Sequence, residues 1–190
     1  MDITALAQLW VAKVLREGDL AVDATVGNGH DTVFLARMVG RSGRVIGFDV
    51  QEGALVAARE NLARVEEGLL EWVVLLRRSH AEMKSALREA RENRRPKAIM
   101  FNLGYLPTGD KSVTTLADET MRALADALDL LAPHGILTTV LYPGHPEGQR
   151  ETEAVLEWAK NLAAPFEAIL SRPLNRAGTA PCLVAVERKA

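Results

Sequence analysis

Short apolar runs alternate along the whole chain with longer stretches in which apolar residues recur every three or four positions. Apolar runs bounded by Gly, Pro or charged residues predict strands, and the longer periodic stretches predict helices. The predicted strands cover residues 20–24, 45–48, 72–76, 98–101, 136–141, 166–170 and 183–186. The predicted helices cover residues 3–16, 31–39, 52–66, 82–92, 114–131 and 147–161. This alternation is typical of an α/β fold in which helices flank a parallel sheet.

The last two predicted strands differ from the others because no helical stretch separates them. Strands joined without a crossover helix pair antiparallel, so we expect an antiparallel hairpin at the C-terminus. Five strand–helix units followed by such a pair are typical of the class I methyltransferase fold, a Rossmann-like seven-stranded sheet. A dinucleotide-binding fold would continue with another crossover helix. We therefore predict a single α/β domain over residues 1–190, with residues 1–17 as a leading helix.

The composition limits the class of protein and the partners that are expected. A chain of 190 residues with 48% hydrophobic and 25% charged residues is ordinary for one soluble globular domain. The net charge of −2 excludes only a partner held by a uniformly basic surface. Cys182 is the single cysteine, so no internal disulfide forms, and no apolar run reaches the roughly 18 residues of a membrane helix. Since residues 1–4 lack a signal-peptide pattern, we expect a cytoplasmic protein without membrane contact.

Two glycines follow the first predicted strand, in the run Thr25-Val26-Gly27-Asn28-Gly29, and a predicted helix begins shortly after them. Glycine lets the backbone approach a ligand closely, and the first turn of a helix leaves N–H groups available to bind it. Asp49 ends the second strand, where a carboxylate suits the two hydroxyls of a ribose. This pattern predicts a nucleotide-like cofactor, although a tight turn without a ligand would have the same glycines.

The charges around the glycines indicate which cofactor is favoured. Thr32 stands where a dinucleotide fold would carry its third glycine, and Asp23 and Asp31 flank the turn. Two carboxylates would repel a pyrophosphate, whereas they suit a sulfonium ligand with an ammonium tail. Asp23 occupies the place where methyltransferases often carry an acid facing the amino group of the methionine moiety. The pattern therefore favours S-adenosylmethionine over a dinucleotide.

The fourth predicted strand ends in Asn102-Leu103-Gly104-Tyr105, in the region where ligands bind in open α/β sheets. The segment resembles the Asn-Pro-Pro-Tyr loop of amino-group methyltransferases, in which the Asn oxygen accepts from the target amine and the aromatic ring stacks on the substrate. Because Leu103 and Gly104 replace the two prolines, adenine or cytosine does not follow as the target. An ordinary loop with a capping Asn is the alternative.

Three further polar residues lie after predicted strands. Ser79 and His80 follow the third strand, beside the expected adenine site, or else belong to a solvated loop. His145 follows the fifth strand and either helps to deprotonate an amine or has a structural role. No metal ligands are assigned.

These motifs together make the chain similar to the MnmM (YtqB-like) tRNA methyltransferases, a family often labelled rRNA methylases, and the likeness runs nearly from end to end. It rests on Val22-Asp23-Ala24-Thr25-Val26-Gly27-Asn28-Gly29-His30-Asp31-Thr32, Gly47-Phe48-Asp49-Val50-Gln51, Ser79-His80, Phe101-Asn102-Leu103-Gly104-Tyr105-Leu106-Pro107-Thr108-Gly109-Asp110-Lys111 and Tyr142-Pro143-Gly144-His145-Pro146-Glu147-Gly148. The Asn-Leu-Gly-Tyr-Leu-Pro run with Gly-Asp-Lys behind it is the most specific of these.

The resemblance implies methylation, with S-adenosylmethionine as cofactor, of the aminomethyl group of 5-aminomethyl-2-thiouridine at the tRNA wobble position. The expected partner is the tRNA anticodon region, and a homodimer is compatible with the pattern. The predicted catalytic residues are Asn102, Tyr105 and His145. The predicted cofactor-binding residues are Asp23, Thr25, Gly27, Asn28, Gly29, Asp31, Thr32, Asp49, Gln51, Ser79, His80, Asn102, Leu103 and Gly104. One segment departs from the family, because the chain has Asn175-Arg176-Ala177-Gly178-Thr179 where relatives tend to carry Asn-Gln and a further Asn.

Three alternatives stay open at this point. The chain could methylate a different amine, on rRNA or on a small molecule. It could be a module that binds nucleotide-like ligands without catalysis, which the intact segment from Asn102 to Tyr105 argues against. It could be a nicotinamide oxidoreductase, which Thr32 and the lack of a hydride-transfer site disfavour.

Overall fold

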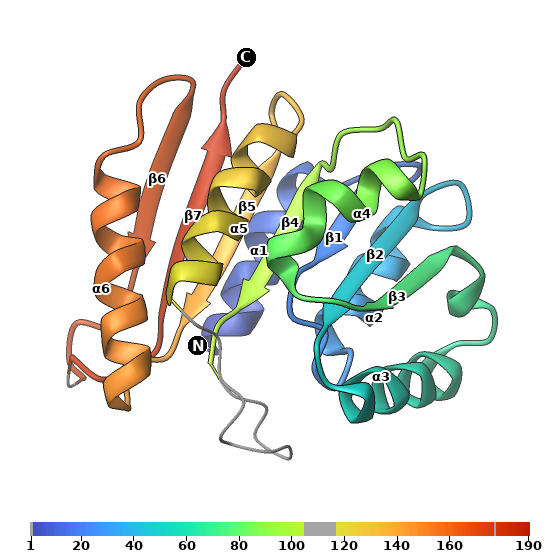
Figure 1. The fold of residues 1–190 in the computed structure, drawn as a ribbon, viewed down its shortest axis with the longest axis horizontal. Helices are drawn as coiled ribbons and strands as arrows, with labels where there is room; N and C mark the ends of the chain where they lie inside the picture. The colour runs from blue at the N-terminus through green and yellow to red at the C-terminus, as the bar shows by residue number, and fades with distance from the viewer. Residues whose placement is uncertain (1, 105–116, 177) are drawn as a thin grey trace.

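A computed structural model of the chain describes residues 2–104, 117–176 and 178–190, and its strands form one seven-stranded sheet (Figure 1). The strands are β1 (Leu20–Asp23), β2 (Arg44–Asp49), β3 (Val73–Arg77), β4 (Ala98–Asn102), β5 (Ile136–Leu141), β6 (Phe166–Ser171) and β7 (Cys182–Arg188). Their order across the sheet is β3-β2-β1-β4-β5-β7-β6. The first five strands pair in parallel, and β7 pairs antiparallel with both β5 and β6. The predicted α/β sheet with a C-terminal antiparallel pair is therefore confirmed.

Helices cover both faces of this sheet (Figure 1). On one face lie α1 (Ile3–Val14), α2 (His30–Val39) and α3 (Glu52–Val65), and on the other lie α4 (Met83–Glu89), α5 (Ala117–Leu130) and α6 (Pro146–Lys160). Two 3-10 turns, η1 (Leu69–Trp72) and η2 (His80–Glu82), precede β3 and α4. Each face has its own apolar core, because the side chains of β1 and β4 alternate between the two faces and are buried on both.

Local signals explain where several helices begin. The Asp2 side chain caps α1 by accepting a hydrogen bond from the Thr4 N–H at 3.1 Å. Pro146 stands in the first turn of α6, where its missing N–H costs nothing. On α1 the buried residues are Ala7 and Val11, and the partly buried residues that pack around them are Ile3, Leu6, Trp10 and Val14.

Two predicted helices differ in extent from those in the structure. The stretch predicted over 82–92 consists of the end of η2 followed by the short α4, and residues after Glu89 leave the helix near Arg91, which adopts a φ of 51°. The helix predicted over 114–131 begins at Ala117 in the described part of the chain, and residues 114–116 lie outside it. Among the described residues, no helix combines the length and the apolar character that crossing a membrane requires.

The strand order reverses between β1 and β4, since β2 and β3 extend the sheet to one side of β1 and β5, β7 and β6 extend it beyond β4. At such a point the loops that leave the two strands diverge, and a crevice opens at the carboxyl edge of the sheet. The fold therefore places the ends of β1, β2 and β4 around one crevice.

Candidate active site

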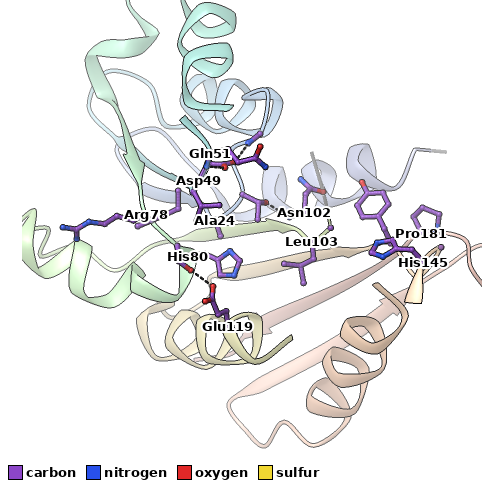
Figure 2. A pocket seen from close by; sticks show the side chains of 18 of the residues that line it. Ala24, Asp49, Gln51, Arg78, His80, Asn102, Leu103, Glu119, His145 and Pro181 are labelled. Carbon is purple, nitrogen blue, oxygen red and sulfur yellow. Dashed lines mark hydrogen bonds between the residues drawn. The ribbon is translucent and has the colours of Figure 1, made fainter. Parts of the chain in front are cut away.

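A cavity of about 500 Å³ opens at the carboxyl edge of the parallel strands. Figure 2 shows Asp49 and His80 toward one end of it and His145 and Pro181 toward the other, with Asn102 and Leu103 between them. The lining residues come from the ends of all five parallel strands, the start of α5 and the segment before β7: Ala24, Thr25, Gly27, Phe48, Asp49, Val50, Gln51, Arg78, Ser79, His80, Asn102, Leu103, Gly104, Glu119, Tyr142, Gly144, His145, Thr179 and Pro181. The volume is ordinary for a site that holds a small molecule or cofactor.

The glycine turn and Asp49 form one unit. The Gly27 N–H donates to Oδ2 of Asp49 at 2.9 Å, and the Gln51 N–H donates to Oδ1 at 2.9 Å. These bonds fix the carboxylate at the cavity wall, and each oxygen keeps a second lone pair for a ligand. Gly29 has a φ of 79°, and a Cβ there would lie 2.8 Å from the Cβ of Ala58, so the turn requires glycine.

Asp23 lies behind this turn and does not line the cavity. It is completely buried, and it accepts hydrogen bonds from the Thr32 hydroxyl at 2.6 Å and the Thr25 N–H at 3.1 Å. Burial first, and then the negative charges of Asp31 and Asp49, raise the pKa of Asp23 to about 7, against the opposite effect of the two hydrogen bonds. Asp31 and Asp49 both lie close enough to act on Asp23, so negative charge gathers around this turn, which favours a cationic ligand.

The segment after β3 forms the end of the cavity where His80 lies. The Ser79 hydroxyl donates to Oε2 of Glu119 at 3.0 Å, which joins this segment to α5. The His80 ring is buried and packs edge-on against Phe101, with ring centroids 5.6 Å apart. Burial lowers the pKa of His80, so the ring is neutral near pH 7, and its Nε2 has no hydrogen-bond partner within the described part of the chain. A buried nitrogen without a partner is a position where a ligand hydrogen bond is expected.

Asn102 ends β4 at the centre of the cavity. Its main-chain N–H donates to the Thr25 hydroxyl at 2.7 Å, and its side-chain NH₂ donates to Oδ2 of Asp31. Its side-chain oxygen is buried and has no hydrogen-bond partner among the residues described, and Asn102 as a residue lines the cavity. This oxygen can therefore accept a hydrogen bond from a bound amine.

Tyr142 and His145 close the opposite end. His145 is the N-cap of α6, and its Nδ1 accepts a hydrogen bond from the Gly148 N–H at 3.1 Å. Burial raises the pKa of the Tyr142 phenol, so this side chain keeps its proton near neutral pH. Neither arrangement resembles a strong base held ready at the cavity.

The structure brings most of the predicted residues together. Those that line the cavity are Thr25, Gly27, Asp49, Gln51, Ser79, His80, Asn102, Leu103, Gly104 and His145. Asp23, Asn28, Gly29, Asp31 and Thr32 lie behind or beside the wall and hold it in place. Tyr105 lies outside the described residues. Glu119 and Arg78 line the cavity without having been predicted as site residues, and Gln8 reaches the site indirectly by donating to Asp31 at 2.7 Å.

A second, smaller cavity of about 260 Å³ adjoins the first. In two segments of the chain, successive residues line the two cavities in turn. Tyr142 and Gly144 line the first cavity, and Pro143 between them lines the second. The same alternation holds along residues 178–182. Arg172 and Arg176, both exposed, line the second cavity, so a cationic surface lies directly beside the main one.

Comparisons with known proteins agree with this geometry. The family model described as "Putative rRNA methylase" matches residues 45–187, and a model of protein-L-isoaspartate O-methyltransferases matches residues 1–76. A chloroplastic protein of Arabidopsis thaliana named tRNA (mnm(5)s(2)U34)-methyltransferase is 36% identical over 95% of this chain and 67% of its own length. A Clostridium thermocellum crystal structure described as "putative rRNA-methylase" has a TM-score of 0.91 and 38% identity, covering 99% of this chain and 98% of the other. A Streptococcus mutans methyltransferase crystallised with SAH has a TM-score of 0.84 and 33% identity over 99% and 98% of the two chains.

Proposed function

This chain belongs to that rRNA-methylase family, and from this premise we propose that it is an S-adenosylmethionine-dependent N-methyltransferase acting on the aminomethyl group of 5-aminomethyl-2-thiouridine at the tRNA wobble position. The observation that carries the proposal is the buried side-chain oxygen of Asn102, an acceptor without a partner among the described residues, on a residue that lines the cavity together with Gly27 and Asp49. The named activity of the chloroplastic relative identifies which amine this is.

The residues of the cavity fit S-adenosylmethionine. In this proposal Asp49, held by two main-chain N–H groups, accepts from both ribose hydroxyls, and the Gly27 turn lets the backbone approach the ligand. His80, neutral and with Nε2 lacking a partner among the described residues, suits the amino group of an adenine ring. The repulsion that Asp31 and Asp49 exert on the charge of Asp23 would be relieved by a cationic sulfonium and aggravated by a pyrophosphate.

When bound, S-adenosylmethionine would supply an activated methyl group, which the amine nitrogen would take with loss of one proton while the electron pair of the broken carbon–sulfur bond would stay on sulfur. The protein's part is chiefly to hold the amine in line, which can supply several kcal/mol of the barrier. Asn102 orients the amine by accepting one of its hydrogens. Burial, and the neighbouring positive charge of the sulfonium, lower the pKa of the amine and favour its reactive neutral form.

The RNA partner is proposed to be the anticodon loop, with the target base turned out of the loop into the cavity. Single-stranded loops are the usual targets of base-specific RNA recognition, because their bases can leave the stack. Arg172 and Arg176 are placed to contact the phosphates of neighbouring nucleotides, since they line the cavity that adjoins the main one. The predicted homodimer and the cytoplasmic location stay predictions, and sedimentation of the purified chain measures the first of them.

The test of the proposed reaction separates RNA substrates directly. Purified protein and S-adenosylmethionine are incubated with tRNA that carries 5-aminomethyl-2-thiouridine, and in parallel with rRNA, and the digested nucleosides are analysed by mass spectrometry. We expect the aminomethyl nucleoside to gain one methyl group in tRNA, with no methyl incorporation into rRNA. Methylation confined to rRNA would favour the family description and contradict the wobble-position proposal.

The proposed RNA-binding role of the two arginines has its own test. Replacing Arg172 and Arg176 together by Ala should raise the KM for tRNA and lower the slope of log affinity against log salt by about 0.7 for each phosphate that the protein no longer binds. The dissociation constant for S-adenosylhomocysteine should not change. The control replaces Arg37 and Arg41, exposed residues at the end of α2 and just beyond it, which should leave the KM for tRNA unaltered. Equal effects of the two pairs would show that Arg172 and Arg176 do not bind the RNA.

A further inference from the structure

Asn102 is held by a chain of hydrogen bonds that begins on a distant helix. Gln8 of α1 donates its side-chain NH₂ to Oδ1 of Asp31 at 2.7 Å, and Asn102 donates its own NH₂ to Oδ2 of the same carboxylate. Asp31 lies 71 residues from Asn102 and 23 residues from Gln8 in the sequence, so three separate elements meet here. The second support of Asn102 is the Thr25 hydroxyl, which accepts from its main-chain N–H.

Asp31 does not line the cavity, and its side chain is nearly buried, with 6% of the residue exposed. Both of its oxygens are engaged by amide NH₂ groups, one from Gln8 and one from Asn102. This arrangement leaves Asp31 behind Asn102 as seen from the cavity.

The chemistry of a carboxylate decides which end of the Asn102 amide faces the cavity. An ionised carboxylate only accepts hydrogen bonds, so it can face the NH₂ end of an amide but not the oxygen end. Turning the Asn102 amide over would place its oxygen against Oδ2 of Asp31, so that two acceptors would face each other. Its NH₂ would then point toward the N–H groups of the substrate amine, so that donors would face each other as well. With Asp31 in place, the NH₂ of Asn102 is held toward the carboxylate, and its oxygen is turned away from Asp31 and lacks any partner in the described chain.

We propose that Asp31, braced by Gln8 of the leading helix, is a positioning residue that fixes the Asn102 amide with its oxygen toward the substrate amine. This rests on the proposed function, because the amine is the group that Asn102 is there to receive. The carboxylate also polarises the amide through the shared hydrogen bond, which increases the negative charge on the Asn102 oxygen. Positive charge develops on the amine nitrogen as the new bond forms, so this polarisation favours the transition state more than the bound substrate.

A double-mutant cycle tests whether Asp31 acts through Asn102. Asp31→Asn keeps the size of the side chain but can offer an amide oxygen to only one of its two neighbours. In the parent background we expect this change to lower kcat about tenfold, with the affinity for S-adenosylhomocysteine within about twofold of the parent. In the Asn102→Ala background the same change should cause no further loss. Independent losses in the two backgrounds, or a large loss of S-adenosylhomocysteine affinity, would overturn the proposal.

Gln8→Ala gives a second approach if Asp31→Asn folds poorly. It should lower kcat by about two- to threefold in the parent and leave it unchanged in the Asn102→Ala background. Gln149→Ala is the matched control, because Gln149 is an exposed glutamine whose side chain donates to Glu153 on the surface of α6. Equal effects of the two glutamine changes would contradict the bracing role of Gln8.

A measurement on the protein without RNA separates this proposal from the proposed function. The side-chain NH₂ signals of Asn102 in ¹⁵N-labelled protein are identified by their loss in Asn102→Ala. In the parent they should be shifted downfield and exchange slowly with solvent, and in Asp31→Asn they should move toward the values of an exposed amide. If Asp31→Asn left these signals unchanged, Asp31 would not hold the Asn102 amide, whatever the enzyme methylates. If the parent showed the shifted, slowly exchanging signals but did not methylate tRNA, the proposed substrate would be refuted instead.

Discussion

The two halves of the cavity are built in different ways. In the cofactor half, around Gly27 and Asp49, the main chain does the positioning, because consecutive turns supply the N–H groups that hold the carboxylate. In the acceptor half, Asn102 depends on side chains from β4, α2 and α1, and the hydrogen bonds between them join distant parts of the sequence. The cofactor half is therefore a local feature of two strand ends, whereas the acceptor half exists only once the whole sheet and its leading helix are assembled.

The largest expected effect lies in the cofactor half. Asp49→Ala removes the acceptor for both ribose hydroxyls, and each hydrogen bond to a charged group contributes roughly 1.5–3 kcal/mol. We expect the dissociation constant for S-adenosylhomocysteine, measured by calorimetric titration, to rise by about a hundredfold or more. Glu60→Ala on the exposed face of α3 is the control and should bind like the parent. An unchanged dissociation constant for Asp49→Ala would mean that Asp49 does not hold the ribose.

The acceptor half should respond in the opposite way. Asn102→Ala leaves the carboxylate and the glycine turn intact, so the affinity for S-adenosylhomocysteine should stay close to that of the parent. Without the oriented amine, kcat should fall on the order of 10²-fold. Single-turnover methylation of tRNA measures this loss. Equal turnover in variant and parent would remove Asn102 from the reaction.

The buried carboxyl behind the cofactor half gives an effect on stability rather than activity. The pKa of Asp23 is about 7 in the folded protein, above the value of about 3.9 for an unfolded chain. The folded state then binds the proton more tightly, so this contribution to stability is fully present below about pH 4 and is lost as the pH rises through about 7. Between pH 5 and pH 8 the ligand-free parent should lose on the order of 2 kcal/mol more stability than Asp23→Asn. Urea unfolding of both proteins at the two pH values measures this, and parallel losses would mean that Asp23 is ionised throughout.

This contrast also explains what the sequence could predict. The strands and the glycine turn are each recognisable from neighbouring residues, and Asp49 from its place at the end of the next strand, so the structure brings together Gly27 and Asp49 as expected although 22 residues separate them. Asp23 and Asp31 were predicted as cofactor-binding residues by their nearness to the glycines, and in the structure neither lines the cavity: Asp23, at the end of β1, accepts from Thr32, and Asp31, in α2, accepts from Gln8 and Asn102. Sequence distance hides such pairings.

Gln8 and Glu119 show the limit of sequence reasoning more directly. Gln8 lies within an amphipathic helix among apolar residues, and nothing beside it in the sequence indicates that it bonds a carboxylate across the fold. Glu119 starts a helix, where an acid is expected for the dipole alone, yet its oxygen accepts from Ser79 on another segment 40 residues away. Such residues become recognisable only when the sheet has brought the elements together.

The smallest effect is expected at His145, at the end of the cavity opposite His80. Its Nδ1 accepts from the Gly148 N–H, so the neutral ring carries its proton on Nε2. To take a proton from the amine at Nδ1, the ring would have to give up the cap of α6. His145→Ala should therefore cost about 1 kcal/mol of stability, through the lost cap, with only a modest fall in rate.

His145→Asn should recover that stability, because Asn is a good N-cap residue. The rate of single-turnover methylation should rise with pH in parent and variants alike, because the titrating group is the bound amine, whose pKa is lowered by burial and by the nearby sulfonium. Tyr142 cannot replace His145 as a base near neutral pH, since burial raises the pKa of its phenol. If His145→Ala abolished methylation while tRNA and S-adenosylhomocysteine still bound, His145 would be the base, and the acceptor half would contain a catalytic group rather than a helix cap.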